Sequence, residues 1–388
     1  MHLDQIQSAL RAAQLDGWLF FDHHGRDPLA YRVLGLKCAH VSRRWYYYIP
    51  QSGEPRGLVH RIESGALDTL PGAKVAYSRW QEQANGLREL LGGAKRVAMQ
   101  YSPLCAIPYV ANVDAGTVEL VRSLGAEVVS SAELIQLFEA RLTPAMLEMH
   151  LEAGHKTDQV RREAFEMVGA ALRKNQPVTE YDAQQFVMQR FAAAGLVTNY
   201  PPIVGVNANA SDPHYSPSKE SCSPIRRGDL LLLDLWAKLD DPDAVYYDVT
   251  WMAFCGGEPS SRMREVFQVV RDARDAGIRF VTESVAARRP IKGFEVDDAV
   301  RGHIEKKGFA NYFTHRTGHS IGRETHGNGA DMDNFESHDE RGVIPWTCFS
   351  IEPGVYLPEF GVRSEVNVFV GESDARVTGE VQRELVLL

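Results

Sequence analysis

The chain has 388 residues, enough for two domains, and its hydrophobic fraction of 44% and charged fraction of 24% are typical of globular proteins. The formal net charge of −9 argues against nucleic acid or an anionic membrane as the main partner, because both favour a basic surface. No apolar run has the length of a membrane span, and the N-terminus carries no signal-peptide pattern. Five scattered cysteines, an odd number, indicate reduced thiols in a cytoplasmic protein.

Residues 1–142 are predicted to form an α/β domain. A helical pattern begins at Leu3, and short strand-like runs then alternate with further helical patterns. This alternation favours a sheet that helices cover on at least one face. The most polar cluster, residues 22–28, is interpreted as a solvated strand-to-helix loop, with a place at the rim of a neighbouring site as the alternative.

A second domain is predicted to begin at residue 143. Thr143 can cap a helix whose first residue is Pro144, and a second helical pattern follows at about residue 180. After residue 196 the chain changes to short runs separated by Pro, Gly and Asn. One turn-rich loop in this part presents His214 between two prolines, which restrict its position.

Two aspartates lie in strand-like runs downstream of that loop. Asp234 follows Leu230–Leu233, and Asp248 lies in the run 245–250, after a polar loop. The two runs are predicted to pair as a hairpin, which would bring the carboxylates near each other. The alternative is two unrelated strand carboxylates, and alternation alone does not show which face Asp234 occupies.

A histidine-rich stretch, residues 315–326, carries His315, His319 and His326 and is interrupted by two glycines, which suit a close approach of the backbone to a ligand. Glu352 and Glu365 follow, each isolated in apolar surroundings. A buried charge is costly unless it is paired or bound to a metal. Four such carboxylates that converge on one histidine would form a metal site.

The ordered set of four carboxylates and one histidine resembles the pita-bread metallopeptidases. The motifs are Gly-His-Ser-Ile-Gly around His319, Ile-Glu-Pro-Gly-Val-Tyr around Glu352 and Gly-Val-Arg-Ser-Glu ending at Glu365. The N-terminal region is similar to that of the branch with prolidase, aminopeptidase P and creatinase. The resemblance implies an α/β creatinase-like domain, residues 1–142, an α+β pita-bread catalytic domain, residues 143–388, and a homodimer.

The resemblance also implies two divalent metal ions. Asp234 would chelate one ion, His319 and Glu352 the other, and Asp248 and Glu365 would bridge both. Four carboxylates repel one another, and two divalent cations neutralise them. One imidazole among oxygen ligands favours Mn, with Co or Zn as alternatives. A hydroxide held between the ions would attack the scissile carbonyl of a proline-containing dipeptide.

Further roles come from the same resemblance. His214 and His326 would lie beside the substrate and hydrogen-bond the carbonyl oxygen and the tetrahedral intermediate, while Glu352 would move the water proton. His315 lies where prolidases carry an active-site histidine. For each histidine the alternative is a residue that orients a neighbouring group and takes no direct part in catalysis.

The chain departs from the family pattern at three places. Trp251 stands where an arginine is usual, Val366 where an acid is usual, and extra residues lie at 240–243. Trp251 is therefore a candidate wall for a proline ring. Arg363 is a candidate for binding the free carboxylate of a dipeptide, with a salt bridge to Glu365 or a neighbouring acid as the alternative.

Three hypotheses about function remain open. The first is a dinuclear-metal Xaa-Pro dipeptidase, with aminopeptidase P, which acts on longer Xaa-Pro-Yaa peptides, as the close alternative. The second is a metal-free creatinase-like amidinohydrolase, and the third is a non-catalytic binding module. Five intact ligand positions argue against both of these.

Overall fold

The computed structural model describes residues 2–37 and 41–388, and it divides into two compact units, Met1–Glu139 and Ala140–Leu388. Cys38 lies outside the described residues, and the other four cysteines are free thiols. Within the described part of the chain, no helix combines the length and apolar character that a bilayer span requires.

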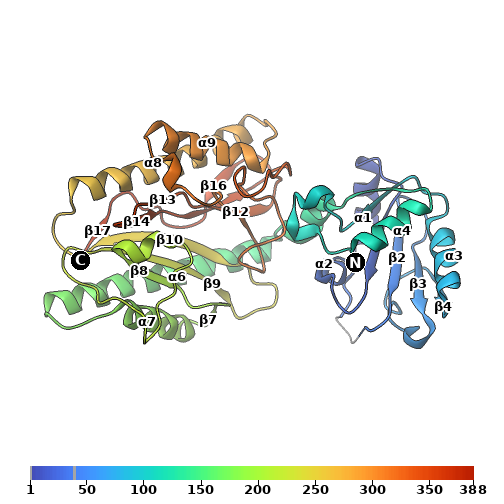
Figure 1. The fold of residues 1–388 in the computed structure, drawn as a ribbon, viewed down its shortest axis with the longest axis horizontal. Coiled ribbons are helices and arrows are strands. Elements are labelled where there is room, and N and C mark those ends of the chain that lie inside the picture. Colours follow the sequence, from blue (N-terminus) through green and yellow to red (C-terminus); the bar gives the residue numbers. More distant parts are fainter. Residues whose placement is uncertain (1, 38–40) are drawn as a thin grey trace. The chain divides into compact units, whose positions relative to one another are not determined.

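The first unit contains one six-stranded sheet in the order β4-β3-β2-β1-β5-β6 (Figure 1). Buried residues of the helices pack on both of its faces, in two separate hydrophobic clusters. The elements are α1 (Leu3–Ala12), β1 (Gly17–Asp22), α2 (Pro28–Leu34), β2 (Trp45–Pro50), β3 (Arg56–His60), β4 (Ala73–Tyr77), α3 (Trp80–Leu91), β5 (Arg96–Met99), α4 (Ala115–Ser123), β6 (Glu127–Ser130) and α5 (Ala132–Ile135). The predicted α/β architecture is confirmed.

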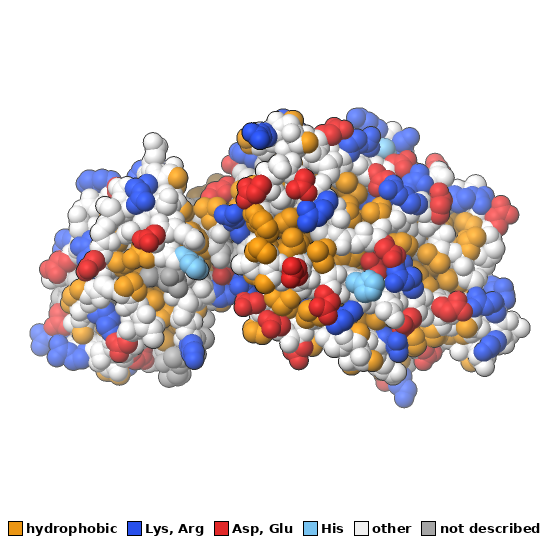
Figure 2. All heavy atoms as spheres, turned by 180° about the vertical axis from the view of Figure 1, so that it is seen from behind, with side chains coloured by type: hydrophobic (Ala, Val, Ile, Leu, Met, Phe, Trp, Pro, Cys, Tyr) orange, Lys and Arg blue, Asp and Glu red, His pale blue; other side chains and the backbone are white. Residues whose placement is uncertain are grey.

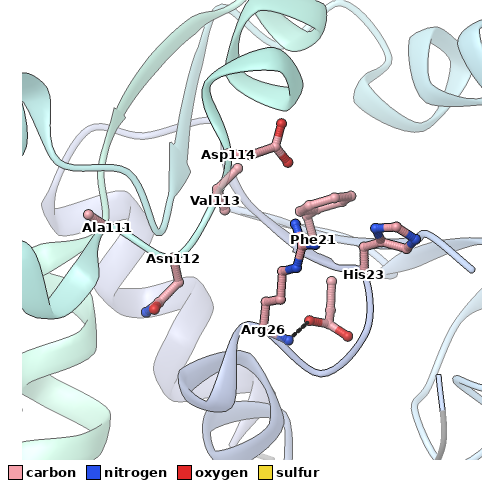
Figure 3. A pocket seen from close by; sticks show the side chains of 8 residues that line it. Phe21, His23, Arg26, Ala111, Asn112, Val113 and Asp114 are labelled. Carbon is pink, nitrogen blue, oxygen red and sulfur yellow. Dashed lines mark hydrogen bonds between the residues drawn. The ribbon is translucent and has the colours of Figure 1, made fainter. Parts of the chain in front are cut away.

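The polar segment at residues 22–28 is the loop from β1 to α2. The Asp22 carboxylate accepts hydrogen bonds from the backbone N–H groups of residues 25–27 and from the Tyr31 hydroxyl. Asp27 caps α2 by accepting from the Ala30 N–H. Figure 3 shows a small hollow at the end of β1, lined by Phe21, the loop and residues 111–114. The carboxylates here are used to shape the loop.

The second unit places helices on two sides of several sheets (Figure 1). Its helices are α6 (Pro144–Arg173), α7 (Glu180–Ala193), α8 (Ser261–Ala286) and α9 (Gly293–Lys306). Its strands are β7 (Leu196–Val197), β8 (Ile203–Val206), β9 (Leu230–Leu239), β10 (Tyr247–Phe254), β11 (Ser320–Ile321), β12 (Thr347–Ile351), β13 (Gly354–Tyr356), β14 (Gly361–Arg363), β15 (Val366–Val370), β16 (Ala375–Val377) and β17 (Val386–Leu387). One sheet has the order β17-β10-β9-β7, with β8 also paired to β9, and another the order β11-β12-β15-β16.

The two faces of β9 pack against different helices. Leu230 and Leu232 belong to the hydrophobic cluster that includes α8 and α9, whereas Leu231, Leu233 and Leu235 belong to the cluster that includes α6 and α7. Because side chains alternate along a strand, Asp234 shares the face of Leu230 and Leu232. The structure therefore shows which face of the strand Asp234 occupies, which the sequence could not.

The surface carries charges of both signs. On the face drawn in Figure 2, acidic and basic side chains are interspersed, and no continuous basic area covers that face. This distribution agrees with the net charge of −9.

Candidate metal centre

The β9–β10 hairpin brings the two aspartates onto one face. The antiparallel register pairs Asp234 with Thr250 and Asp248 with Trp236. Val249 and Tyr247 belong to the cluster of the α6 and α7 side, so Asp248 and Thr250 point to the opposite face, which is that of Asp234. The predicted hairpin is confirmed, and its two carboxylates lie in adjacent rows of the same face.

Hydrogen bonds across the sheets bring the histidine and the glutamates to this face. The Glu365 N–H donates to the Thr250 carbonyl oxygen over 3.2 Å, and the Thr250 hydroxyl donates to Glu365 Oε2 over 3.0 Å. The Ser350 hydroxyl accepts from the His319 N–H over 2.9 Å and donates to Glu352 Oε1 over 3.0 Å. Glu365 is therefore anchored to β10, and His319 and Glu352 are anchored to each other through Ser350.

The ligand atoms converge. One ligand atom from each of Asp248, His319 and Glu365 lies within 4.8 Å of the other two. His319 Nε2 is 3.3 Å from Glu352 Oε1 and 3.7 Å from Asp248 Oδ2. The structure thus brings together His319 and three of the four carboxylates that the sequence selected, those of Asp248, Glu352 and Glu365.

The chemistry of this set fits divalent cations. Asp234 Oδ1, Asp248 Oδ1 and Glu365 Oε1 are buried, and none has a hydrogen-bond partner among the described residues. Burial and then the neighbouring carboxylates raise the pKa values of Asp248 and Glu365 well above their usual range. Burial raises the pKa of Glu352 to about 7. Carboxylate oxygens that lack a donor are costly, and a cation would satisfy them.

The tautomer of His319 also suits a ligand. Its Nδ1 lies 3.1 Å from the Ser320 carbonyl oxygen, which can only accept, so Nδ1 carries the proton. Burial, followed by the nearby His326 and Arg316, lowers the pKa of His319 well below its usual value. A neutral ring with a free Nε2 lone pair facing the carboxylates is the form that binds a metal.

Arg363 holds the aspartate side of the centre. Its Nη2 donates to Asp234 Oδ2 over 2.6 Å, its Nε to the Thr250 hydroxyl over 3.1 Å and its Nη1 to the Tyr356 hydroxyl over 3.0 Å. The side chain is 3% exposed. The salt bridge that the sequence offered as an alternative is thus present, with Asp234 as the acid, and capture of a substrate carboxylate stays a prediction.

His315 is bound on both ring nitrogens. Nδ1 lies 2.7 Å from the Arg316 carbonyl oxygen and therefore donates to it, so Nε2, 2.7 Å from the Tyr356 hydroxyl, accepts the hydroxyl proton. Burial, followed by Arg363, lowers the pKa of His315 to about 3. This geometry supports the alternative in which His315 orients Tyr356. The sequence analysis missed Tyr356, although it ends the Ile-Glu-Pro-Gly-Val-Tyr motif.

His326 and His214 lie toward the open side of the centre. The rings of His326 and His319 have centroids 4.3 Å apart. Burial of part of the His326 side chain, followed by Arg316 and His214, lowers the pKa of His326 to about 4, so the two histidines are electrostatic neighbours. Both are exposed. Their access to solvent is compatible with substrate contact, and their catalytic roles stay predictions.

Glu180 anchors the loop that presents His214. Its fully buried carboxylate accepts hydrogen bonds from the Val206 N–H (2.7 Å), the Ser223 N–H (2.6 Å), the Tyr215 hydroxyl (2.6 Å) and the Asn209 amide (3.0 Å). These donors lie on both ends and in the middle of the loop 206–223. The sequence analysis missed Glu180 because its role depends on partners up to 43 residues away.

The prediction that Trp251 walls the substrate pocket is wrong. Alternation along β10 turns its indole away from Asp248 and Thr250, toward the hydrophobic cluster of α6 and α7. The guanidinium carbon of Arg161 lies 3.4 Å from the centroid of the Trp251 ring. Arg161 is itself buried and paired with Asp158. Trp251 therefore belongs to the packing beneath the sheet.

Comparisons with known proteins agree with this arrangement. A family model described as metallopeptidase family M24 matches residues 148–372. The Xaa-Pro dipeptidase of Lactobacillus helveticus is 30% identical over 240 residues, which are 62% of this chain and 59% of that protein. The match to a probable dipeptidase, PepE, of Mycobacterium tuberculosis is 24% identical and spans 92% of this chain and 88% of the relative. The chain thus spans less than two thirds of the length of the Lactobacillus relative.

Solved structures show the same fold. Dipeptidase PepE from Mycobacterium ulcerans superposes with a TM-score of 0.71 at 24% identity, over 99% of this chain and 96% of that chain. Recombinant prolidase from Thermococcus sibiricus superposes with a TM-score of 0.65 at 22% identity, over 100% and 98% of the two chains. The predicted two-part architecture, with a pita-bread second part, is confirmed.

Proposed function

The chain belongs to metallopeptidase family M24, and from this premise we propose that it is a metal-dependent Xaa-Pro dipeptidase. The observation that carries the proposal is the set of three buried carboxylate oxygens without donors, on Asp234, Asp248 and Glu365. Asp248 and Glu365 also lie within ligand distance of His319, a neutral histidine with a free Nε2. A proline-directed substrate is supported by the relatives named Xaa-Pro dipeptidase.

We assign five residues as ligands of two divalent cations, Asp234, Asp248, His319, Glu352 and Glu365. Four oxygen-donating side chains and one imidazole form a hard ligand set that suits Mn, with Co or Zn as alternatives. Two such cations would activate a water molecule and polarise the scissile carbonyl.

The chain's own residues perform the positioning and the proton transfer. Glu352 is held through Oε1 by the Ser350 hydroxyl, and we assign this carboxylate to take up the proton of the attacking water and return it. Arg363 fixes Asp234 through Oδ2 and leaves Oδ1 without a donor. We assign His326 and His214 as donors to the substrate carbonyl oxygen, where charge develops during attack.

The proposal extends to assembly and location. The resemblance to the prolidase branch supports a homodimer, and four free thiols support a reducing compartment such as the cytoplasm.

Aminopeptidase P activity is the second candidate. A putative Xaa-Pro aminopeptidase of Mycoplasma pneumoniae is 30% identical over 190 residues, and the crystal structure of an X-Pro aminopeptidase from Thermotoga maritima superposes with a TM-score of 0.60. The creatinase-like alternative is disfavoured, because a metal-free site would leave the three carboxylate oxygens without partners.

Proline release by metal-stripped protein tests these alternatives. Samples are restored with Mn, Co or Zn and supplied with Xaa-Pro dipeptides and one Xaa-Pro-Yaa tripeptide. Metal-restored cleavage of the dipeptides alone supports the dipeptidase, and cleavage of the tripeptide as well supports aminopeptidase P. Folded protein that hydrolyses neither substrate with any of the metals would refute both activities.

A further inference from the structure

Trp236 lies on the face of the candidate metal centre. It follows Asp234 by two residues on β9, so the two side chains point to the same side of the sheet. The hairpin register places Trp236 directly across from Asp248. Paired residues on one face of an antiparallel sheet have Cβ atoms about 5 Å apart. The Trp236 side chain therefore leaves the backbone next to that of Asp248, one of the carboxylates of the centre.

The orientation of this indole is held by a hydrogen bond. Its Nε1–H donates to the Asn199 side-chain oxygen over 2.8 Å. The side chain packs against the hydrophobic cluster that contains Ile321 and Tyr246, yet it keeps partial exposure to solvent. Trp18, a tryptophan of the hydrophobic core, is by contrast fully buried, with 0% exposure. A rigid aromatic face thus remains accessible next to the polar centre.

The chain beside Trp236 extends the apolar surface. Tyr200 follows Asn199 and is 69% exposed, and Pro201 after it is also exposed. Large apolar side chains that stay exposed next to buried titratable groups are typical of ligand sites, where apolar walls accompany a few polar groups.

The position of the scissile bond places a dipeptide relative to this surface. In the proposed function the scissile carbonyl is attacked at the centre, so it must lie close to the ligand set that includes Asp248. The carbon atom that carries the side chain of the first residue is bonded directly to that carbonyl carbon. This side chain therefore lies within reach of Trp236, the register partner of Asp248.

We propose that Trp236 is a specificity-determining residue, whose indole packs against an apolar side chain of the residue before proline. The proposal rests on the proposed function and refines it: large apolar residues at this position are preferred over glycine and over acidic residues. Burial of a large apolar side chain against an aromatic face favours its substrate by about 10-fold or more over the glycine substrate.

The test compares kcat/KM for Leu-Pro, Gly-Pro and Asp-Pro in the wild type, Trp236→Ala and Trp236→Phe. Trp251→Phe is the matched control, because it removes an indole from the opposite face of the same hairpin. We expect the Leu-Pro to Gly-Pro ratio to fall to near unity in Trp236→Ala, with Gly-Pro hydrolysis within about threefold of wild type. Trp236→Phe keeps an aromatic face and should retain the preference, as should Trp251→Phe.

Three results would overturn the proposal. The first is an unchanged ratio in Trp236→Ala, and the second is an equal loss for Leu-Pro and Gly-Pro, which indicates a purely structural role. The third is Trp236→Phe behaving as Trp236→Ala. If the wild type hydrolyses no dipeptide, the proposed function fails. The role of Trp236 is then tested separately, by calorimetric measurement of the affinities for L-leucine and glycine. A leucine preference that Trp236→Ala abolishes supports it, and the absence of such a preference refutes it.

Discussion

Glu180→Gln is expected to loosen the loop that presents His214. The carboxylate accepts from four donor groups, and an amide keeps one oxygen for two of them while its NH2 group faces the other two. A hydrogen bond to a charged group contributes about 1.5–3 kcal/mol, and the Tyr215 hydroxyl can rotate to accept from the new amide. The expected loss in the free energy of unfolding is therefore about 2–4 kcal/mol.

Urea unfolding and steady-state kinetics measure the two consequences. The variant should lose kcat/KM by about the same factor as His214→Ala, and the double variant should be no worse than His214→Ala alone, because both changes remove one function. Asp182→Asn is the control: this carboxylate lies on the same helix turn, is exposed, and caps only Thr179. It should cost about 1 kcal/mol or less.

The reasoning about Glu180 would be refuted by either of two results. One is Glu180→Gln with wild-type stability and activity. The other is a double variant whose loss of kcat/KM is the product of the two single losses, since independent residues act additively in free energy.

Three further predictions concern the centre and its support. Glu365→Ala should abolish metal-dependent proline release. It should not destabilise the metal-free protein, because it removes a buried carboxylate that the neighbouring carboxylates repel. Retained turnover would contradict the ligand assignment. Metal-free protein should lose stability as the pH rises from about 5 through 7, because the pKa of Glu352 is raised from 4.5 in the unfolded chain to about 7 in the folded protein. At about 1.36 kcal/mol per pKa unit, ionising Glu352 in the folded state costs about 3 kcal/mol. A urea midpoint that stays constant over this pH range would contradict the prediction. Gly361→Ala should cost about 1–3 kcal/mol in urea unfolding, because the added Cβ would overlap the Ala210 carbonyl, whereas Gly302→Ala, in open space on α9, should be neutral or stabilising.

Local motifs allowed the sequence to predict the set of candidate ligands. Each of His319, Glu352 and Glu365 lies within a short pattern of glycines and apolar residues, and each is a charge or imidazole that an apolar run cannot bury alone. Helix starts were equally local, because the Thr143 hydroxyl caps the helix from three residues away. Such features depend on neighbours in the chain, so one sequence suffices to recognise them.

The tertiary structure alone decided what each group faces. Whether Asp234 points to the centre depends on which helices cover each side of β9, and its pairing with Arg363 joins residues 129 positions apart. The same alternation removed Trp251 from the site and placed Trp236 beside Asp248. Strand register and the packing of distant segments set these relations, and composition at a single position carries no information about either.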